Sequence, residues 1–456
     1  MIDALPFLML GVLAVLLFSG LPVAMLLSGI GVAFCFFGMA LGEMPLAALY
    51  NIPPKLLSSL QSSLFYPAVV MLLFMGVALE KSDIARDMLT CLRVMLWRAP
   101  AGLILAVLLI GVVMAPAAGI VGASVVTLAL IALPTMMKNG YSAETATGAV
   151  AAAGTVGIIL PPAVMLFFMA SEFRVPLGSM FMSTVIPGAI LIVAYIIYYL
   201  GLGILRPAPV GDDPIELPKG FPAWSILFTR GLIMPFGLIA LVLSAIIFGW
   251  ATPSQSGAVG AAGGLVLVAL SGRFSWALLK DIMLATSRLS AMVFFIIMAA
   301  AVFSYPFRYF GGDSAIADAL RALSLEPWSM LMLILGIIFV LGFFIDWIEI
   351  TVITLPLFIP VLSALDFASH VGNGPTTMLW MATITALILQ TSFITPPFGF
   401  ALFFLRGAAP DGVSLVQIYR GILPILMIQL CVIALMLMFP ELIMWLPEQI
   451  YGTIRG

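Results

Sequence analysis

Apolar residues occur along this chain in continuous runs separated by short polar segments. A helix of about 20 apolar residues crosses the ~30 Å hydrocarbon core of a bilayer. A transmembrane β-strand would instead need about ten residues of alternating polarity, and stretches such as 8–17 and 189–200 do not alternate. The pattern therefore predicts an all-α polytopic membrane protein, with spans near residues 4–19, 21–41, 60–80, 142–170, 180–205, 228–249, 253–271, 288–310, 375–405 and 416–440.

Two further apolar regions, 99–138 and 327–363, are interrupted in the middle. The first breaks at residues 116–119 and Gly122, and the second breaks around Asp346 and Glu349. Each region could form two straight spans or one re-entrant hairpin that enters and leaves on the same side. Both arrangements add an even number of crossings, so the orientation of the later spans does not depend on the choice.

The distribution of basic residues predicts the orientation. Cytoplasmic loops carry an excess of Lys and Arg, and placing the N-terminus outside puts 13 of the 18 basic residues in the cytoplasm. The five left outside are Lys55, Arg174, Arg308, Arg321 and Arg455. Because no basic residue precedes Lys55, we expect no cleavable signal peptide. The sequence thus predicts a multi-pass protein of the bacterial inner membrane with a periplasmic N-terminus.

The two halves of the chain resemble each other in the order of their features. A proline-rich polar stretch, 206–224, divides them. Each half has a span, a broken apolar region, a span interrupted by Pro-Pro and a further span, and the predicted orientations are opposite. This is the inverted repeat of secondary transporters. It predicts N-terminal scaffold helices in 1–59, a first repeat in 60–205, a linker and central scaffold helices in 206–287, a second repeat in 288–440 and a C-terminal tail in 441–456.

The Pro-Pro pairs are the strongest candidates for a binding site. Proline removes a backbone donor and interrupts a helix, which frees carbonyl oxygens. In hydrocarbon such backbone is tolerated only where it is buried or lines a cavity. One Pro-Pro pair could merely kink its helix, but two in corresponding positions indicate a midplane site. The residues concerned are Gly154, Thr155, Gly157, Pro161 and Pro162 in the first half, and Thr391, Ser392, Thr395, Pro396 and Pro397 in the second.

The broken apolar regions carry polar side chains that could face these breaks. Ser124 and Thr127 are three residues apart and therefore share a helix face. Hydroxyl and carbonyl oxygens of this kind suit a sodium ion. In the second half, Asp346 and Glu349 are acidic residues within an apolar stretch, which is a functional-site candidate by default. They could also form a helix cap or a structural salt bridge.

Several motifs resemble a known family. They read GIVGASVVTLALIALPTMMKNGY, AAAGTVGIILPP, GWATPSQSGAVGAAGGL, PLFIPVL and QTSFITPPFGFALFFLRG. In this order they are similar to the large membrane subunit of tripartite ATP-independent periplasmic (TRAP) transporters. The resemblance implies an elevator-type transporter with two re-entrant hairpins and two broken helices, a small four-helix membrane subunit and a soluble periplasmic binding protein that delivers the substrate.

The resemblance also implies sodium sites between each hairpin tip and its neighbouring broken helix. These would be formed by Ser124 with Gly154, Thr155 and Gly157, and by Thr351 with Thr391, Ser392 and Thr395. Candidate substrate contacts are Thr127, Pro161, Pro162, Asp346, Glu349, Pro396 and Pro397. Gln255 departs from the family pattern, in which glutamate is common at this position. We therefore expect sodium-driven uptake of a small organic anion, a carboxylate by resemblance, with sodium as coupling ion and no organic cofactor.

Other functions are less consistent with the sequence. The three cysteines have no paired spacing, the single histidine His370 lies in a predicted solvated loop, and no P-loop is present. Scattered acids give little support to an intramembrane enzyme, and scattered basic residues give none to nucleic-acid binding. A stand-alone sodium/carboxylate symporter of a related elevator fold remains an alternative, although the Ser-Asn-Thr triplets of such carriers are missing. A channel is a further alternative, less consistent with an inverted repeat.

Overall fold

The computed structural model describes residues 4–61, 65–114, 121–205, 220–372 and 374–452. This part of the chain contains helices and no strand, and each predicted span is helical. Within it, six helices are long and apolar enough to cross a membrane. The prediction of an all-α polytopic membrane protein is confirmed.

The helices of the first half follow the predicted order. They are α1 (Leu5–Leu17), α2 (Val23–Ala40), the 3-10 helix η2 (Leu46–Asn51), α3 (Ile52–Gln61), α4 (Tyr66–Lys81), α5 (Ile84–Met95), α6 (Gly102–Met114), α7 (Val121–Lys138), α8 (Ala143–Val156), α9 (Val164–Glu172) and α10 (Leu177–Leu205).

The second half follows the linker, of which 206–219 lie outside the described residues. Its helices are α11 (Phe221–Phe228), the π-helical turn η3 (Thr229–Ile233), α12 (Met234–Ile247), α13 (Pro253–Leu270), α14 (Trp276–Tyr309), α15 (Gly312–Ala322), α16 (Pro327–Leu341), α17 (Trp347–Glu349), the π-helical turn η4 (Ile350–Thr354), α18 (Leu355–Leu362), α19 (Pro375–Ser392), α20 (Phe400–Ala408), α21 (Leu415–Met438) and α22 (Glu441–Tyr451).

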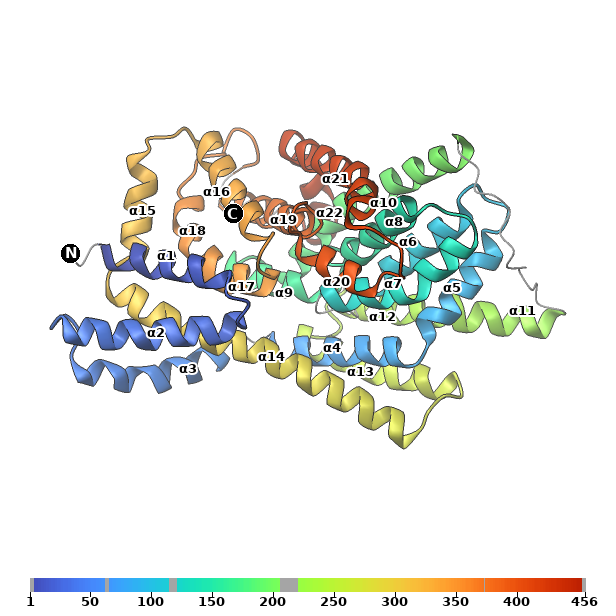
Figure 1. Ribbon diagram of the computed structural model, residues 1–456, viewed down its shortest axis with the longest axis horizontal. Helices are drawn as coiled ribbons and strands as arrows, with labels where there is room; N and C mark the ends of the chain where they lie inside the picture. The colour runs from blue at the N-terminus through green and yellow to red at the C-terminus, as the bar shows by residue number, and fades with distance from the viewer. Residues whose placement is uncertain (1–3, 62–64, 115–120, 206–219, 373, 453–456) are drawn as a thin grey trace.

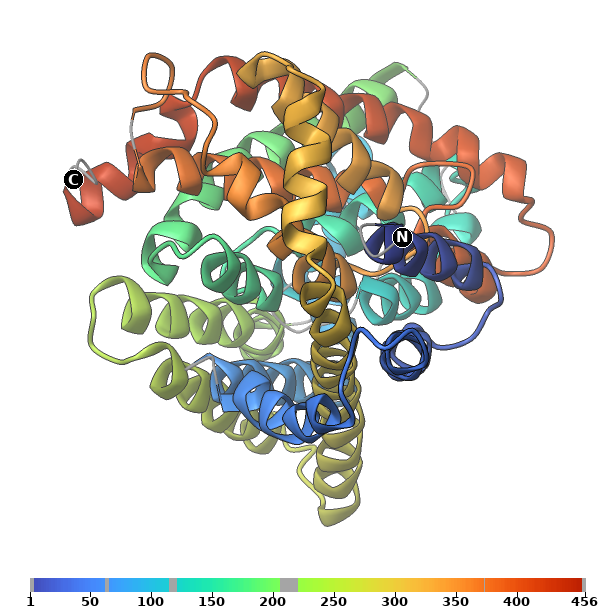
Figure 2. The same ribbon diagram turned by 90° about the vertical axis from the view of Figure 1, so that its left-hand side faces the viewer.

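Helices of the first half pack directly against helices of the second half. Helix α2 packs against α14 of the second half, and α13 packs against α4 of the first. In the same way α10 packs against α19, and α21 packs against α8. Figure 1 shows α2, α3, α4, α13 and α14 in the lower part of the molecule, with α8, α10, α19 and α21 in the upper part; Figure 2 shows the same separation from the side. Each broken helix is thus held by the last long helix of the other half.

The first broken apolar region forms α6 and the 18-residue α7, and the second forms α16 followed by α17, η4 and α18. Helices α6 and α16 contain 13 and 15 residues, which corresponds to roughly 20 Å of length, less than the ~30 Å of a hydrocarbon core. The break at 116–119 lies outside the described residues. Short arms agree with re-entrant hairpins, but which side each arm ends on stays a prediction.

Some helices lie where we expected connections. Helices α5 and α15 each follow a long helix and have a polar and an apolar face. The segment assigned to a C-terminal tail contains α22, which packs against α10. The predicted border at residue 288 falls inside α14, which begins at Trp276 after Ser275 accepts a hydrogen bond from the backbone N–H of Leu278. Helices α5, α15 and α22, unlike α14, are too short or too polar to resemble a span.

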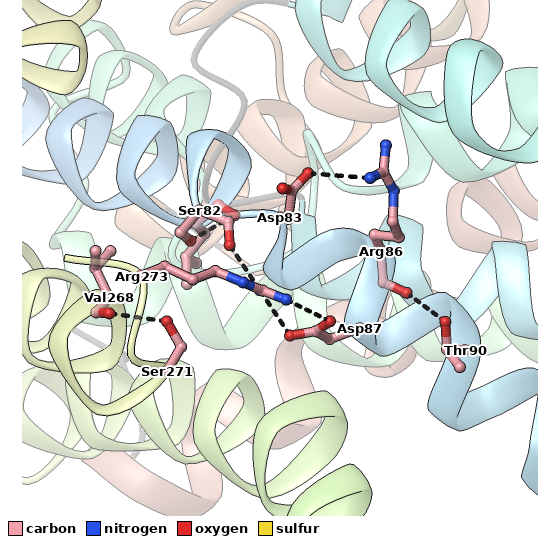
Figure 3. A network of polar contacts seen from close by, with 9 residues as sticks. Ser82, Asp83, Arg86, Asp87, Thr90, Val268, Ser271 and Arg273 are labelled. Carbon is pink, nitrogen blue, oxygen red and sulfur yellow. Dashed lines mark hydrogen bonds and ion pairs between the residues drawn. The ribbon is translucent and has the colours of Figure 1, made fainter. Parts of the chain in front are cut away.

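An ion pair fastens the start of α5 to the turn between α13 and α14 (Figure 3). The Arg273 guanidinium donates two hydrogen bonds to the Asp87 carboxylate, at 2.7 and 2.9 Å, and one to the Ser82 carbonyl at 2.8 Å. The hydrogen bonds that Arg273 donates to Asp87 raise the pKa of Arg273 above its usual value. Close packing of Gly231 in η3 against Cys91 holds α5 from another side. The corner between α4 and α5 is therefore tied to α13 and α14.

We expect a measurable coupling free energy for this pair. Bidentate arginine–carboxylate pairs are stronger than single contacts, and the Arg273 and Asp87 side chains are only 33% and 23% exposed. A double-mutant cycle with Asp87→Asn and Arg273→Gln, measured by denaturant unfolding in detergent, should give about 1 kcal/mol. The exposed pair Asp83–Arg86, at 3.8 Å, serves as control and should give near zero. Equal coupling in both cycles would contradict this role.

Candidate functional site

The first Pro-Pro pair interrupts a buried helix, as predicted. Helix α8 begins after Ser142, whose side chain accepts a hydrogen bond from the Thr145 backbone N–H. It ends at Val156 with Gly157 as its C-cap, and α9 begins only at Val164. The bond between Pro161 and Pro162 is cis, and both prolines are buried. The carbonyl end of α8 therefore lies inside the protein.

Helix α7 packs closely on the last turn of α8 at Gly154. A Cβ atom on Gly154 would come within 2.6 Å of the Val125 side chain and 3.1 Å of its Cα. This close approach of α7 and α8 requires glycine at position 154, and Ser124 directly precedes the contacting Val125. The Ser124 hydroxyl is buried and has no hydrogen-bond partner within the described ranges. An unpaired buried oxygen costs free energy unless a ligand or water satisfies it.

The hydroxyl groups of three threonines in the predicted sites donate hydrogen bonds to backbone carbonyls one helical turn earlier. Thr155 donates to the Ala151 carbonyl at 2.8 Å, and Thr391 and Thr395 donate in the same way to the carbonyls of Leu387 and Thr391, both at 2.8 Å. Each partner lies four residues earlier. The hydroxyl oxygen keeps lone pairs that can accept a further contact, so this hydrogen bond does not exclude a cation ligand.

The second broken helix has a different contact with its hairpin. Helix α19 ends at Ser392 and α20 begins at Phe400; the intervening Pro396–Pro397 bond is also cis. A Cβ atom on Gly342, at the end of α16, would come within 1.9 Å of the Ser392 hydroxyl oxygen. The turn after α16 also contacts the Pro-Pro loop, because the rings of Phe344 and Phe398 are 4.8 Å apart.

Thr351 lies in η4, which directly continues α17. Its hydroxyl donates to the Trp347 carbonyl at 2.7 Å, and its segment η4 packs against α9, α14 and α16. The grouping of Thr351 with Thr391, Ser392 and Thr395 therefore stays a prediction. Sequence reasoning missed Gly342, although this glycine directly follows an apolar run and precedes the acidic motif.

The two acidic residues have different surroundings. Asp346 caps α17, since its Oδ1 accepts a hydrogen bond from the Trp347 backbone N–H at 2.8 Å; this agrees with the alternative that it is a helix cap. Glu349 Oε2 is buried without a partner among the described residues, and so are both side-chain polar atoms of Gln390. Gln390 was not predicted, although a glutamine within an apolar run is a visible signal.

Other candidates have partners within the chain. Thr127 donates to Glu80 Oε1 on α4 at 3.0 Å, so its hydroxyl links α7 to α4. Pro397 is exposed, and its carbonyl accepts a hydrogen bond from the Tyr419 hydroxyl. Gln255 forms a capping box with Thr252, in which Gln255 Oε1 accepts from the Thr252 backbone N–H at 2.8 Å. The departure from glutamate therefore leaves a helix cap in place.

The expectation of a solvated His370 needs correction. The residue is half-buried, its ring packs against Trp328 and Trp380, and its Nε2 lies 2.8 Å from the Leu437 carbonyl oxygen. The aromatic packing between α16 and α19 covers part of this side chain, so it is only partly solvated.

The chain matches the family described as "Tripartite ATP-independent periplasmic transporter, DctM component" over residues 10–442. It belongs to this family. The C4-dicarboxylate TRAP transporter large permease protein DctM of Pseudomonas aeruginosa is 26% identical over 388 residues, which cover 84% of this chain and 86% of that protein. The isethionate TRAP transporter permease protein DctMQ of Oleidesulfovibrio alaskensis is 26% identical over 449 residues, or 97% of this chain and 66% of that protein.

The fold is also similar to a solved structure. The YdaH transporter of Alcanivorax borkumensis superposes with a TM-score of 0.62 at 15% identity, covering 92% of this chain and 98% of that one. Family membership makes this TRAP subunit a multi-pass transporter component and not an enzyme. Such a large permease works with a small membrane subunit and a periplasmic binding protein.

Proposed function

We propose that this TRAP permease drives the uptake of a small organic anion with a sodium gradient. The observation that carries the proposal is the buried, unpartnered Ser124 hydroxyl, which lies next in the chain to Val125, the residue that packs on Gly154 in the last turn of α8. Broken helices of transporters coordinate sodium through unwound carbonyls and helix C-terminal ends. The partial negative charge of a helix C-terminus favours a cation there. The first sodium site would thus combine Ser124 with Gly154, Thr155 and Gly157.

A second sodium site is proposed at the end of α19. It would use Thr391, Ser392 and Thr395, with Thr351 as the hairpin ligand. The support is the helix break before Pro396 and the contact of Gly342 with Ser392, which brings the hairpin region to this helix end. The unpaired Glu349 and Gln390 lie in the same two segments and become additional candidates.

The proposed mechanism is an elevator movement. The layer of α2, α3, α4, α13 and α14 would stay fixed, while the hairpins and broken helices would move across it. Thr127 and Glu80 form a hydrogen bond between these two groups of helices, and this contact would break during movement. The corner held by Arg273 and Asp87 would act as an anchor of the fixed layer.

The substrate class is inferred from the relatives. Their names give a C4-dicarboxylate and isethionate, which are small organic oxyanions. We propose the same class here, delivered by the periplasmic binding protein, with a four-helix small subunit completing the transporter. We also propose that the chain lies in the inner membrane with a periplasmic N-terminus, an orientation supported by the distribution of basic residues.

Reconstitution tests the function directly. Proteoliposomes with the chain and both partner subunits should accumulate labelled succinate or isethionate only with an inward sodium gradient. Replacing sodium by potassium should reduce uptake to background, and undiminished uptake would refute sodium coupling. The chain alone should be inactive, because delivery and assembly need the other components. Full uptake by the single chain would favour a stand-alone symporter.

A further inference from the structure

A cavity of about 520 Å³ separates the fixed layer from the hairpin region. Helices α3, α4 and α14 form one side, and α9 and η4 form the other. Along α14 it extends from Ile297 to Tyr309, a distance of roughly 18 Å at helical rise. At η4 it is lined by Val352, which directly follows Thr351. The cavity therefore leads from the end of α14 toward one proposed sodium ligand.

The charges around this cavity favour an anion. Lys55 from α3 and Arg308 from α14 are cationic, and Glu172 from α9 is the single acidic lining residue. The hydroxyls of Ser58, Ser59 and Tyr305 in the wall donate to backbone carbonyls of the chain, so the charged donors of the cavity are the Lys55 ammonium and the Arg308 guanidinium. These groups can hold the oxygens of a carboxylate or sulfonate. Polar donors around an apolar floor are typical of a small-molecule site.

The cationic wall is held in place. The Tyr305 hydroxyl donates to the Ala48 carbonyl at 2.8 Å and accepts from Asn51 at 3.2 Å, which ties η2 to α14 next to α3. Arg308 Nε lies 3.3 Å from Asp313 Oδ2, and the Arg308 side chain remains 56% exposed. Its guanidinium keeps donors beyond this contact, since arginine carries five.

We propose that this cavity is a vestibule that captures a small organic oxyanion through Lys55 and Arg308 before translocation. This proposal rests on the proposed function, because a vestibule that binds anions serves transport only if the substrate is an anion. The orientation predicted from the basic residues places Lys55 and Arg308 on the periplasmic side, where a binding protein releases its ligand. Two cations in a recessed site raise the local concentration of anions.

Thiol modification tests the vestibule without any transport measurement. Ser304 is half-buried in the cavity wall, so Ser304→Cys introduces a reporter of nearly equal size. Cys431 is the exposed natural cysteine and is replaced by alanine. The probes are a sulfonate-bearing and a trimethylammonium-bearing methanethiosulfonate. The first delivers a sulfonatoethyl group that resembles isethionate. The ratio of the two modification rates reports the potential inside the cavity.

The sulfonate probe should react faster than the cationic probe, relative to their rates with free cysteine. The double variant Lys55→Gln/Arg308→Gln should lower this ratio about five-fold or more. Asp313→Asn is a control that breaks the same ion pair as Arg308→Gln but keeps the cation. The ratio in this variant should be equal to or higher than in the wild type. Arg321→Gln removes an exposed cation outside the cavity and should change nothing. Lys55 and Arg308 are exposed, so these proteins should fold.

An unchanged ratio in the double variant would overturn the vestibule, and so would an equal drop in Asp313→Asn. Nanodiscs distinguish a free anion from a lipid headgroup. If added phosphatidylglycerol slowed the sulfonate probe more with Lys55 and Arg308 present than in the double variant, where only the negative surface potential of the membrane acts, an anionic lipid would occupy the cavity and the proposal would fail. The modification rates do not depend on sodium. The vestibule can therefore fail or hold independently of whether sodium drives uptake.

Discussion

Replacing Gly421 by alanine should abolish the folded transporter or its uptake. Helices α8 and α21 approach each other through two glycines, and a Cβ atom on Gly421 would lie 2.0 Å from the Glu144 carbonyl oxygen. A Cβ atom on Gly148 would lie 2.3 Å from the Gly421 carbonyl oxygen. The neighbouring atoms belong to backbone, so a rotamer change cannot relieve the overlap. The helices must separate, which costs about 3 kcal/mol or more in a packed interior.

The loss should extend to function because α21 supports α8, whose last turn contains Gly154. We expect a lower unfolding temperature by intrinsic tryptophan fluorescence in detergent, and at least a ten-fold lower uptake rate in whatever protein survives. Gly336→Ala in α16 is the matched control, since no described heavy atom lies within 4 Å of its new methyl group. Alanine there should be neutral or stabilising. A normal unfolding temperature for Gly421→Ala would show that the two helices are not closely packed.

The bilayer makes the long helices predictable from sequence. The predicted spans 21–41 and 253–271 agree with α2 (Val23–Ala40) and α13 (Pro253–Leu270), because hydrocarbon demands an uninterrupted apolar helix. The breaks in α8–α9 and α19–α20 were equally visible, since Pro-Pro cannot continue a helix. Helix α5 was missed because Arg86, Asp87 and Arg93 interrupt its apolar positions. A search for a 3.6-residue period would have found it.

The site could be predicted only in part. The grouping of Ser124 with Gly154 came from the family resemblance, and it stays a prediction; the structure shows that Val125, the next residue after Ser124, packs on Gly154. The contact between Gly342 and Ser392 was not visible, because it joins residues 50 positions apart whose meeting depends on how α16 packs on α19. The same holds for the vestibule, whose residues come from five separate segments. Hydropathy carries no information on which helices become neighbours.

Replacing Ser124 by alanine should weaken sodium binding without weakening the fold. Sodium affinity should fall while the free energy of unfolding stays the same or rises. This contrast distinguishes an ion ligand from a packing residue. As a packing residue, Ser124 only buries an unpartnered hydroxyl, so its removal should be neutral or stabilise the protein by up to ~1 kcal/mol. As a sodium ligand, it contributes about 1.5–3 kcal/mol, the range of hydrogen bonds to charged groups. The half-saturating sodium concentration of uptake should then rise roughly ten-fold or more.

Ser256→Ala is the control for this experiment. Ser256 on α13 is also buried and has no hydrogen-bond partner in the described part of the chain, but it lies in the fixed layer away from both helix breaks. Its replacement should change stability as Ser124→Ala does and leave the sodium dependence unchanged. Ser124→Thr keeps the oxygen and should retain much of the sodium affinity, and Thr155→Val should resemble Ser124→Ala. Initial uptake rates against external sodium, with unfolding curves of the same preparations, decide between the roles. A wild-type sodium dependence in Ser124→Ala, or an equal shift in Ser256→Ala, would remove Ser124 from the ion site.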